Sequence, residues 1–310
     1  MSAERPTKHI VQSLLVNVAI AVAKGIAAIL TGSGAMLAET LHSAADCGNQ
    51  VLLLVGLRQA SKAPDATHPL GYGRALYFWS FMVALLLFTA GGMFSIYEGI
   101  HKIRHPEAVD NVWVGLAILA FSLALEGAAT ISNIREIGRR RGDRPFLSYL
   151  RQTKDSDLVV VFGENLAASV GLLFAIAALC TAHFSGDSRW DGLGSVAIGA
   201  VLVAVAVFLA IEVQSLLVGE AADRDIEHAA REIAREHPRL ESLLQIITMQ
   251  QGPGEVLVAL KVRFGAALTS DEIADAINEF EASLRRRRPE VKWLFIEPDL
   301  PPVAQPALIS

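Results

Sequence analysis

Cysteine and charge are both scarce in this chain of 310 residues. Its two cysteines, Cys47 and Cys180, lie within apolar stretches, which excludes a disulfide framework as the basis of the fold. Charged residues make up 19% of the sequence, against roughly 25% in soluble domains, while hydrophobic residues reach 52%. The net charge of -5 offers no basic surface, so nucleic acid is not an expected partner. This balance favours a protein embedded in a lipid bilayer.

Six apolar stretches are long enough to cross a bilayer, which takes roughly 20 residues in a helix. They cover residues 10–30, 35–57, 77–100, 112–134, 158–181 and 193–217. After residue 218 the sequence becomes more polar, and its periodicity predicts helix, strand, strand, helix and strand in that order. We therefore expect a membrane α-helical domain of six spans over 1–218, a small α+β domain over 219–299 and a disordered tail over 300–310.

The basic residues indicate the orientation of these spans, because such residues are retained on the cytoplasmic side of a membrane. With a cytoplasmic N-terminus, the outer segments hold only Lys102, Arg104 and Arg189. The inner segments hold many more: Arg5, Lys8, Arg58, Lys62, Arg74, Arg135, Arg139, Arg140, Arg141, Arg144, Arg151 and Lys154. Both termini are therefore predicted to be cytoplasmic. The alanine-rich composition, with more arginine than lysine, is typical of a bacterial protein, which would place the chain in the inner membrane.

The second apolar stretch carries three ionisable side chains, although each costs about 2.5–3.5 kcal/mol at the centre of a membrane helix. Glu39, His42 and Asp46 follow one another at steps of three and four residues, which places them on one helix face. The fifth stretch carries Glu164 and Asn165. Imidazole and carboxylate groups are ligands for zinc and neighbouring metals, and two carboxylates neutralise a divalent cation. The pattern predicts a metal site at His42, Asp46 and Glu164.

Several polar side chains in these stretches suit proton exchange or simple helix pairing. His42 is the natural proton carrier, because imidazole titrates near neutral pH and must be deprotonated to bind metal. Glu126, in the fourth stretch, is a second candidate for carrying protons. Glu39 lies nearer the outer end and suits a vestibule, and Lys24 is expected to snorkel toward the interface. The competing interpretation is that the charged groups merely pair with one another across helices.

Three motifs carry a resemblance to a known family. They are Gly32-Ser33-Gly34-Ala35-Met36-Leu37-Ala38-Glu39, His42-Ser43-Ala44-Ala45-Asp46 and His68-Pro69-Leu70-Gly71-Tyr72-Gly73-Arg74, and residues 213–217 add support at the end of the last span. The chain resembles the cation diffusion facilitators, which are dimeric metal/proton antiporters with six spans and a cytoplasmic ferredoxin-like domain of αββαβ order. The likeness covers almost the whole chain, to about Asp299.

The resemblance implies a tetrahedral metal site of four ligands, formed by residue pairs from the second and fifth spans. His42 and Asp46 match the first pair, and Glu164 matches the acidic member of the second. Val160 stands where relatives often have a histidine, so the fourth ligand is left open. Three candidates remain: Asn165, Asn49 and water.

The resemblance also implies a second metal site, in the loop after the second span. Asp65 and His68 match two of its ligands, while Tyr72 replaces a third, which is histidine in relatives. A purely structural loop is the alternative. Arg74 matches a basic residue that pairs with an acid near the end of the last span, for which Glu220 is the nearest candidate.

The C-terminal domain lacks the histidines that bind regulatory metal in relatives. Its histidines, His228 and His237, lie on or just after the first predicted helix of the domain. We therefore interpret the domain as a dimerisation module without a full regulatory metal cluster, and we expect the protein to be a homodimer.

The predicted function is efflux of a divalent transition-metal ion in exchange for protons. Zinc is favoured, and iron, cobalt, nickel and manganese are the alternatives. A membrane sensor or scaffold that binds metal without moving it is the competing hypothesis. A hydrolytic metalloenzyme ranks lower, because the motif His-Glu-x-x-His is absent. We thus expect no enzyme activity and no cofactor besides the transported metal.

Overall fold

The computed structural model describes residues 4–153 and 156–300. Its contacts divide the chain into a helical unit and a unit that contains the sheet. The helical unit comprises Met1–Gln59, Ala75–Arg151 and Asp155–Gln214. The sheet unit comprises Ala60–Arg74, Gln152–Lys154 and Ser215–Ser310. The tail expected to be disordered lies outside the described residues from residue 301 onward, as do Lys154 and the side chains of Arg5 and Lys8.

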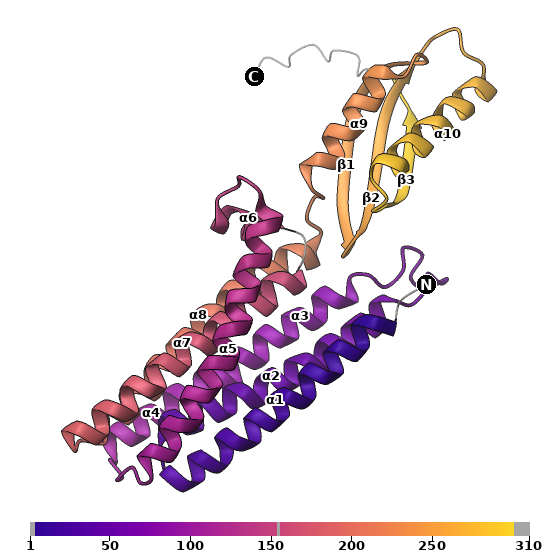
Figure 1. Ribbon diagram of the computed structural model, residues 1–310. Coiled ribbons are helices and arrows are strands. Elements are labelled where there is room, and N and C mark those ends of the chain that lie inside the picture. Colours follow the sequence, from indigo (N-terminus) through magenta and orange to yellow (C-terminus); the bar gives the residue numbers. More distant parts are fainter. Residues whose placement is uncertain (1–3, 154–155, 301–310) are drawn as a thin grey trace, which may run out of the picture. The chain divides into compact units, whose positions relative to one another are not determined.

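A helix covers each of the six apolar stretches, and these helices run side by side (Figure 1). Their bounds are α1 (Glu4–Thr31), α2 (Gly34–Ala60), α3 (Ala75–Leu86) continued by the π-helical η1 (Leu87–Met93) and α4 (Phe94–Arg104), α5 (Val112–Arg141), α7 (Ser156–Ser185) and α8 (Arg189–Val218). A short helix, α6 (Phe146–Gln152), connects α5 to α7.

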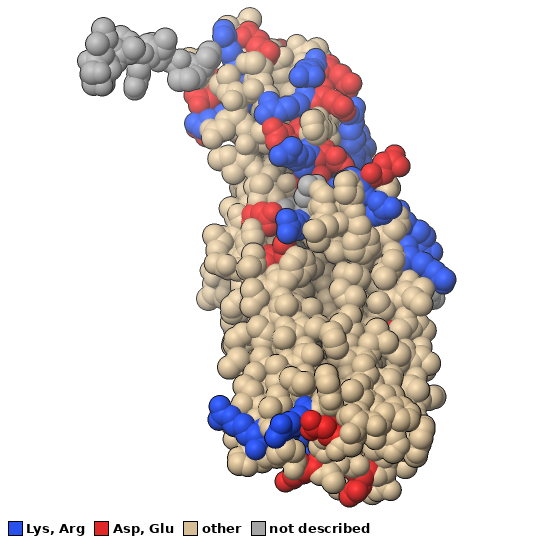
Figure 2. Space-filling view, turned by 90° about the vertical axis from the view of Figure 1, so that its left-hand side faces the viewer, with Lys and Arg blue, Asp and Glu red and all other residues tan. Residues whose placement is uncertain are grey.

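Within the described residues, four helices are long and apolar enough to cross a membrane: Ala75–Arg104, Val112–Arg141, Leu158–Ser185 and Arg189–Val218. Within the described residues, the apolar part of α1 is shorter and covers Asn17–Thr31. α2, which carries Glu39, His42 and Asp46, is not among these four. Large apolar side chains face outward along the unit, and the face shown in Figure 2 has few charges along its middle. Both features suit contact with lipid.

Glycine residues let α8 approach the continuous helix formed by α3, η1 and α4. A Cβ atom added at Gly92 would lie 2.6 Å from a methyl group of Val203, and one added at Gly199 would lie 2.7 Å from the carbonyl oxygen of Gly92. Larger residues would therefore force the two helices apart. Glycine contacts of this kind are common where membrane helices pack together.

Asp191 and Lys102 hold the tight turn between α1 and α2. The Asp191 carboxylate, in the first turn of α8, accepts hydrogen bonds from the Ser33 hydroxyl and the Gly34 backbone amide, and so caps the start of α2. The Lys102 ammonium donates to the Gly32 carbonyl and lies 3.8 Å from Asp191. Lys102 was expected as an outer loop charge, but the structure places it on α4 with 7% of its surface exposed. Its buried ammonium group therefore contributes to the packing of α4 against the turn and α8.

The sheet unit runs α9 (Arg224–Glu236), β1 (Leu240–Gly252), β2 (Glu255–Phe264), α10 (Ser270–Arg287) and β3 (Val291–Pro298), in the order predicted from the sequence. Within the described residues its sheet has three strands in the order β1-β2-β3. β1 and β2 are antiparallel, with Ile246 opposite Leu260, while β2 and β3 are parallel. The predicted capping box at Thr269 and Glu272 begins α10.

The two faces of this sheet differ in burial. On one face, alternate side chains of β2 such as Val258 and Leu260 pack against α9 and α10, whose Ile233 and Phe280 complete a self-contained apolar core. On the other face, Ile247, Ala259 and Phe295 lie next to one another across the three strands. Ile247 and Phe295 are exposed, so the unit presents an uncovered apolar strip.

Replacing Asp191 by alanine should destabilise the helical unit. The change leaves the buried ammonium of Lys102 without its carboxylate and removes the cap of α2, and breaking a buried ion pair costs about 3–5 kcal/mol. Thermal unfolding in detergent should therefore begin at a clearly lower temperature than in the wild type. Asp143→Ala, in the exposed turn after α5, is the control. Equal melting of the two variants would show that Asp191 does not hold the turn.

Candidate metal centre

His42 and Asp46 lie one helical turn apart on the buried face of α2. The side chain of His42 is fully buried, and its Nδ1 atom is 3.7 Å from Oδ1 of Asp46. Neither ring nitrogen of His42 nor Oδ1 of Asp46 has a hydrogen-bond partner among the described residues. Two ligands of one tetrahedral zinc ion, each about 2.0 Å from the metal, lie about 3.3 Å apart. The pair is thus close to the separation that a shared ion requires.

Glu164, on α7, is held by a neighbour from α2. The Asn49 side chain donates a hydrogen bond of 2.7 Å from Nδ2 to Oε1 of Glu164. Oδ1 of Asn49 has no partner in the described part of the chain. Val160, one turn before Glu164, is fully buried and offers no ligand. Asn49 therefore orients the Glu164 carboxylate, and its own oxygen is still free to bind an ion.

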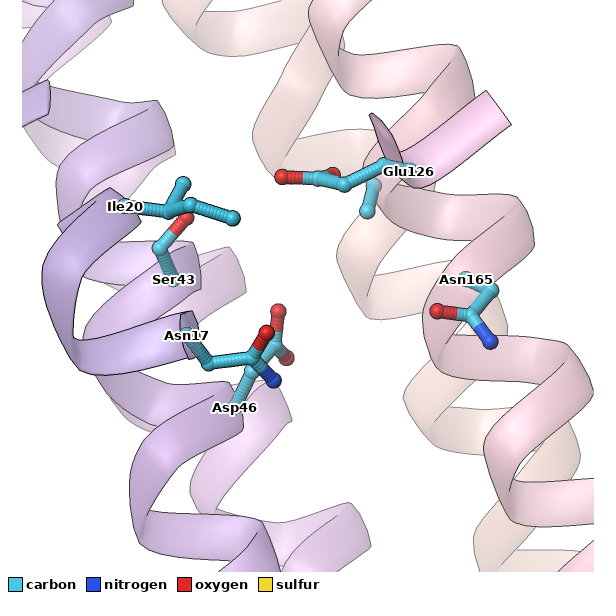
Figure 3. A pocket seen from close by; sticks show the side chains of 7 residues that line it. Asn17, Ile20, Ser43, Asp46, Glu126 and Asn165 are labelled. Carbon is cyan, nitrogen blue, oxygen red and sulfur yellow. The ribbon is translucent and has the colours of Figure 1, made fainter. Parts of the chain in front are cut away.

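Two cavities adjoin these residues. The smaller has a volume of about 40 Å³, room for a few water molecules, and is lined by Asn17, Ser43, Asp46, Glu126 and Asn165 among others (Figure 3). The larger, of about 550 Å³, shares Asp46, Glu126 and Asn165 and adds Glu164. The smaller cavity draws its walls from α1, α2, α5 and α7, whereas the predicted ligands came only from α2 and α7.

The position predicted for the Lys24 side chain from the sequence is wrong. Instead of snorkelling, its ammonium is fully buried and bonds to three oxygen atoms: Glu39 Oε2 at 3.1 Å, Ser43 Oγ at 2.9 Å and Glu126 Oε1 at 2.9 Å. Glu39 is accordingly a buried partner of Lys24 and not an open vestibule residue. Three helices, α1, α2 and α5, meet at this one ammonium group.

The structure brings some of the predicted ligands together and keeps others apart. His42 lies beside Asp46, Asn49 bonds Glu164, and Asp46, Glu164 and Asn165 all line the larger cavity. In the described residues, however, no three His, Cys, Asp or Glu side chains gather closely enough to hold one ion. Binding would therefore have to draw ligands on different helices closer together.

Comparison with known proteins assigns the helical region to a family. The family model for the cation efflux transmembrane domain matches residues 10–218. This chain belongs to the cation diffusion facilitator family. The family likeness inferred from the three motifs is thereby confirmed.

Curated members of the family from distant organisms are similar to this chain. A proton-coupled zinc antiporter, SLC30A9 of mitochondria, from Xenopus laevis is 31% identical over 84% of this chain and 47% of its own length. The human SLC30A9 is 28% identical over 84% of this chain and 46% of its own. Metal tolerance protein C4 of Arabidopsis thaliana is 28% identical over 77% of this chain and 52% of its own. The chain spans about half the length of these relatives.

In this cation diffusion facilitator, hydrogen bonds occupy the loop site expected at Asp65 and His68. Oδ1 of Asp65 accepts from the hydroxyl of Thr67 and from the backbone amide of His68, and Oδ2 accepts from the Tyr72 hydroxyl at 2.7 Å. The rings of His68 and Tyr72 lie 4.1 Å apart. A metal ion at Asp65 would have to displace these bonds, which together make a compact turn.

The expected partner of Arg74 stays a prediction. Nη2 of Arg74 donates to the sulfur atom of Met249 at 2.5 Å. The same nitrogen would lie 3.2 Å from a Cβ atom added at Gly219, the residue directly before Glu220. The guanidinium group is therefore near the segment that carries Glu220, as the predicted pair requires.

Replacing Tyr72 by phenylalanine should raise the pKa of Asp65. In the wild type, the hydrogen bond from the Tyr72 hydroxyl is the main cause that lowers the pKa of Asp65 below its ordinary value of about 3.9. A lowered pKa stabilises the turn above that ordinary value, and the contribution is lost as pH falls through the folded pKa. The variant turn should thus loosen at a higher pH than the wild-type turn.

Carboxyl carbon NMR shifts of labelled aspartate, followed against pH, would measure this difference. Tyr97→Phe, on the exposed side of α4, is the matched control and should leave Asp65 unchanged. An Asp65 midpoint that is the same in the wild type and in Tyr72→Phe would contradict the prediction.

Proposed function

We propose that the chain transports a divalent transition-metal ion out of the cytoplasm in exchange for protons, with zinc as the favoured ion. The observation that carries this proposal is the buried pair His42 and Asp46, which faces no hydrogen-bond partner in the described structure although it lies within a membrane helix. Such groups are too costly to keep unless they bind something. A nitrogen with carboxylate oxygens suits zinc, and iron, cobalt, nickel and manganese are the alternatives.

The larger cavity supports alternating access from the cytoplasmic side. Its lining continues from Asp46 along α2 through Leu53 and Leu57 to Leu76 at the start of α3, toward the loop between α2 and α3. With cytoplasmic termini, that loop is on the inner side. Glu39 lies on the other side of Asp46, about 10 Å away along the helix, and is tied to Lys24. We infer an inward-facing arrangement in which the opposite end is closed.

Proton exchange follows from competition at His42. A metal ion and a proton both require the ring nitrogen lone pair, so binding of one releases the other. Glu126 lines the larger cavity together with Asp46 and is our second candidate for carrying protons. The relatives whose names describe proton-coupled zinc antiporters support this exchange and the choice of zinc.

We further propose six spans with both termini in the cytoplasm of a bacterium, a charge pair between Arg74 and Glu220, and a homodimer joined through the C-terminal unit. The αββαβ order of that unit supports a ferredoxin-like fold. The apolar strip of Ile247, Ala259 and Phe295 supports dimerisation, since monomers seldom leave such a face bare.

Charge introduced into this apolar strip should separate the dimer. Because the sheet unit has its own core, residues 220–310 can be expressed alone and their mass measured with a chelator present. The wild type should be dimeric without metal, and Phe295→Glu should be largely monomeric, because like charges would face each other. Asn278→Glu adds the same charge on the exposed side of α10 and should stay dimeric. A wild-type domain that pairs only when zinc is added would contradict this proposal.

Transport itself is tested by flux in proteoliposomes across a panel of divalent ions, with internal pH recorded at the same time. The wild type should move zinc with a counterflow of protons, and Asp46→Ala and Glu164→Ala should abolish flux while the protein stays folded. Glu136→Gln, at the exposed end of α5, is the control. Metal binding without any flux in the wild type would favour the sensor or scaffold hypothesis.

A further inference from the structure

The small cavity beside Asp46 has a second carboxylate on its wall, from a helix that the predicted ligand set did not include. Figure 3 shows Glu126 reaching from α5 into the cavity, with Asp46 and Asn17 on the other side and Asn165 on the adjacent α7. The Val160 side chain leaves the predicted set one ligand short. The cavity therefore has an unassigned oxygen donor where a further ligand is needed.

The two oxygen atoms of Glu126 differ in their surroundings. Oε1 accepts a hydrogen bond from Lys24, whereas Oε2 is sealed from solvent and has no partner among the described residues. Lys24 already uses its three donors on Glu39, Ser43 and Oε1 of Glu126. The ammonium therefore has no hydrogen left for Oε2, and an unsatisfied buried carboxylate oxygen is costly.

His42 lies beside Asp46, which lines the opposite wall, and its unpartnered ring supports this region as a place for a cation. Its side chain is fully buried, both ring nitrogens lack a partner in the described residues, and Nδ1 points to within 3.7 Å of Asp46 Oδ1. The carboxylates of Asp46 and Glu126 and the amides of Asn17 and Asn165 surround a space that holds a few water molecules. The imidazole of His42 is not part of this lining and lies beside Asp46. Two carboxylates also balance the charge of a divalent ion.

We propose that Glu126 is a ligand of the transported ion, and that Lys24 competes with the ion for this carboxylate. Asn17 and Asn165 complete an oxygen-rich shell together with Asp46. This inference rests on the proposed transport function and names a further ligand and a built-in competitor for it. Because oxygen donors suit harder ions, Glu126 raises affinity for Mn²⁺ more than for Zn²⁺.

The two members of the Glu126–Lys24 pair then act in opposite directions. Removing the carboxylate in Glu126→Gln weakens ion binding, and removing the ammonium in Lys24→Met strengthens it, because Oε1 is released to the ion. If the pair served packing alone, either change would lower stability and neither would alter ion affinity. The sign of the effect on affinity thus separates a ligand from a structural partner.

The experiment measures Mn²⁺ and Zn²⁺ affinity of the full-length protein in detergent after removal of bound metal. Glu126→Gln should lower Mn²⁺ affinity by about tenfold or more, since even indirect partners of metal ligands account for 10–100-fold. The loss for Zn²⁺ should be smaller, and Lys24→Met should bind both ions more tightly than the wild type. Glu136→Gln, the same change on the same helix but at its exposed end, should bind as the wild type does.

A double variant keeps the test decisive if either single change impairs folding. Lys24→Met with Glu126→Gln removes one charge of each sign, so the cavity keeps its net charge. Affinity that stays low in the double variant supports a ligand role for Glu126. Wild-type affinity in the double variant, or in a folded Glu126→Gln, would overturn it. If the wild type still transports ions in that case, only the ligand role of Glu126 is wrong and the proposed transport function is retained. If the wild type neither binds nor transports ions, the proposed transport function itself is wrong.

Discussion

The low dielectric of a membrane interior is the constraint on which the rest of this structure depends, because a buried charge there needs a partner. Lys24 satisfies that need with oxygen atoms from Glu39, Ser43 and Glu126. These bonds join α1 to α2 and α5 at a single point. The same group therefore stabilises the bundle and determines which acidic oxygen atoms stay unpaired.

Of the residues with unpaired buried oxygen atoms, Asp46 and Glu126 line the cavities. Glu39 and Glu126 bond the buried Lys24, and Asp46, Glu126 and Glu164 line the larger cavity, so the acids of this region outnumber its buried lysine. Lys24 occupies oxygen atoms of Glu39 and Glu126, and Asn49 occupies one of Glu164. Oδ1 of Asp46 and the ring of His42 are left without partners among the described residues. A divalent cation is the simplest group that could compensate this surplus of acid.

A second buried ion pair stabilises the N-terminal end of α2. Asp191 caps the helix and Lys102 lies beside it, so the turn between α1 and α2 is held by charges as well as by backbone bonds. Cavity lining extends from Asp46 toward the other end of α2, where it includes the apolar side chains of Leu53 and Leu57. The buried pair thus lies at the N-terminal end of α2, whereas the cavity extends along its C-terminal half.

The sequence by itself determined the faces of the helices and strands that follow from local periodicity. The steps from Glu39 to His42 and Asp46 define one face of α2, and the alternation in β2 separates its buried side chains from its partly buried ones. Only the tertiary structure decided which charges meet. Lys24 and Glu126 are 102 positions apart, and no pattern within one helix shows that their helices touch. The sequence predicted Lys24 at the membrane interface and Lys102 in a loop. It shows the position of each lysine along its own helix, but not which carboxylate from another helix lies close enough to pair with it.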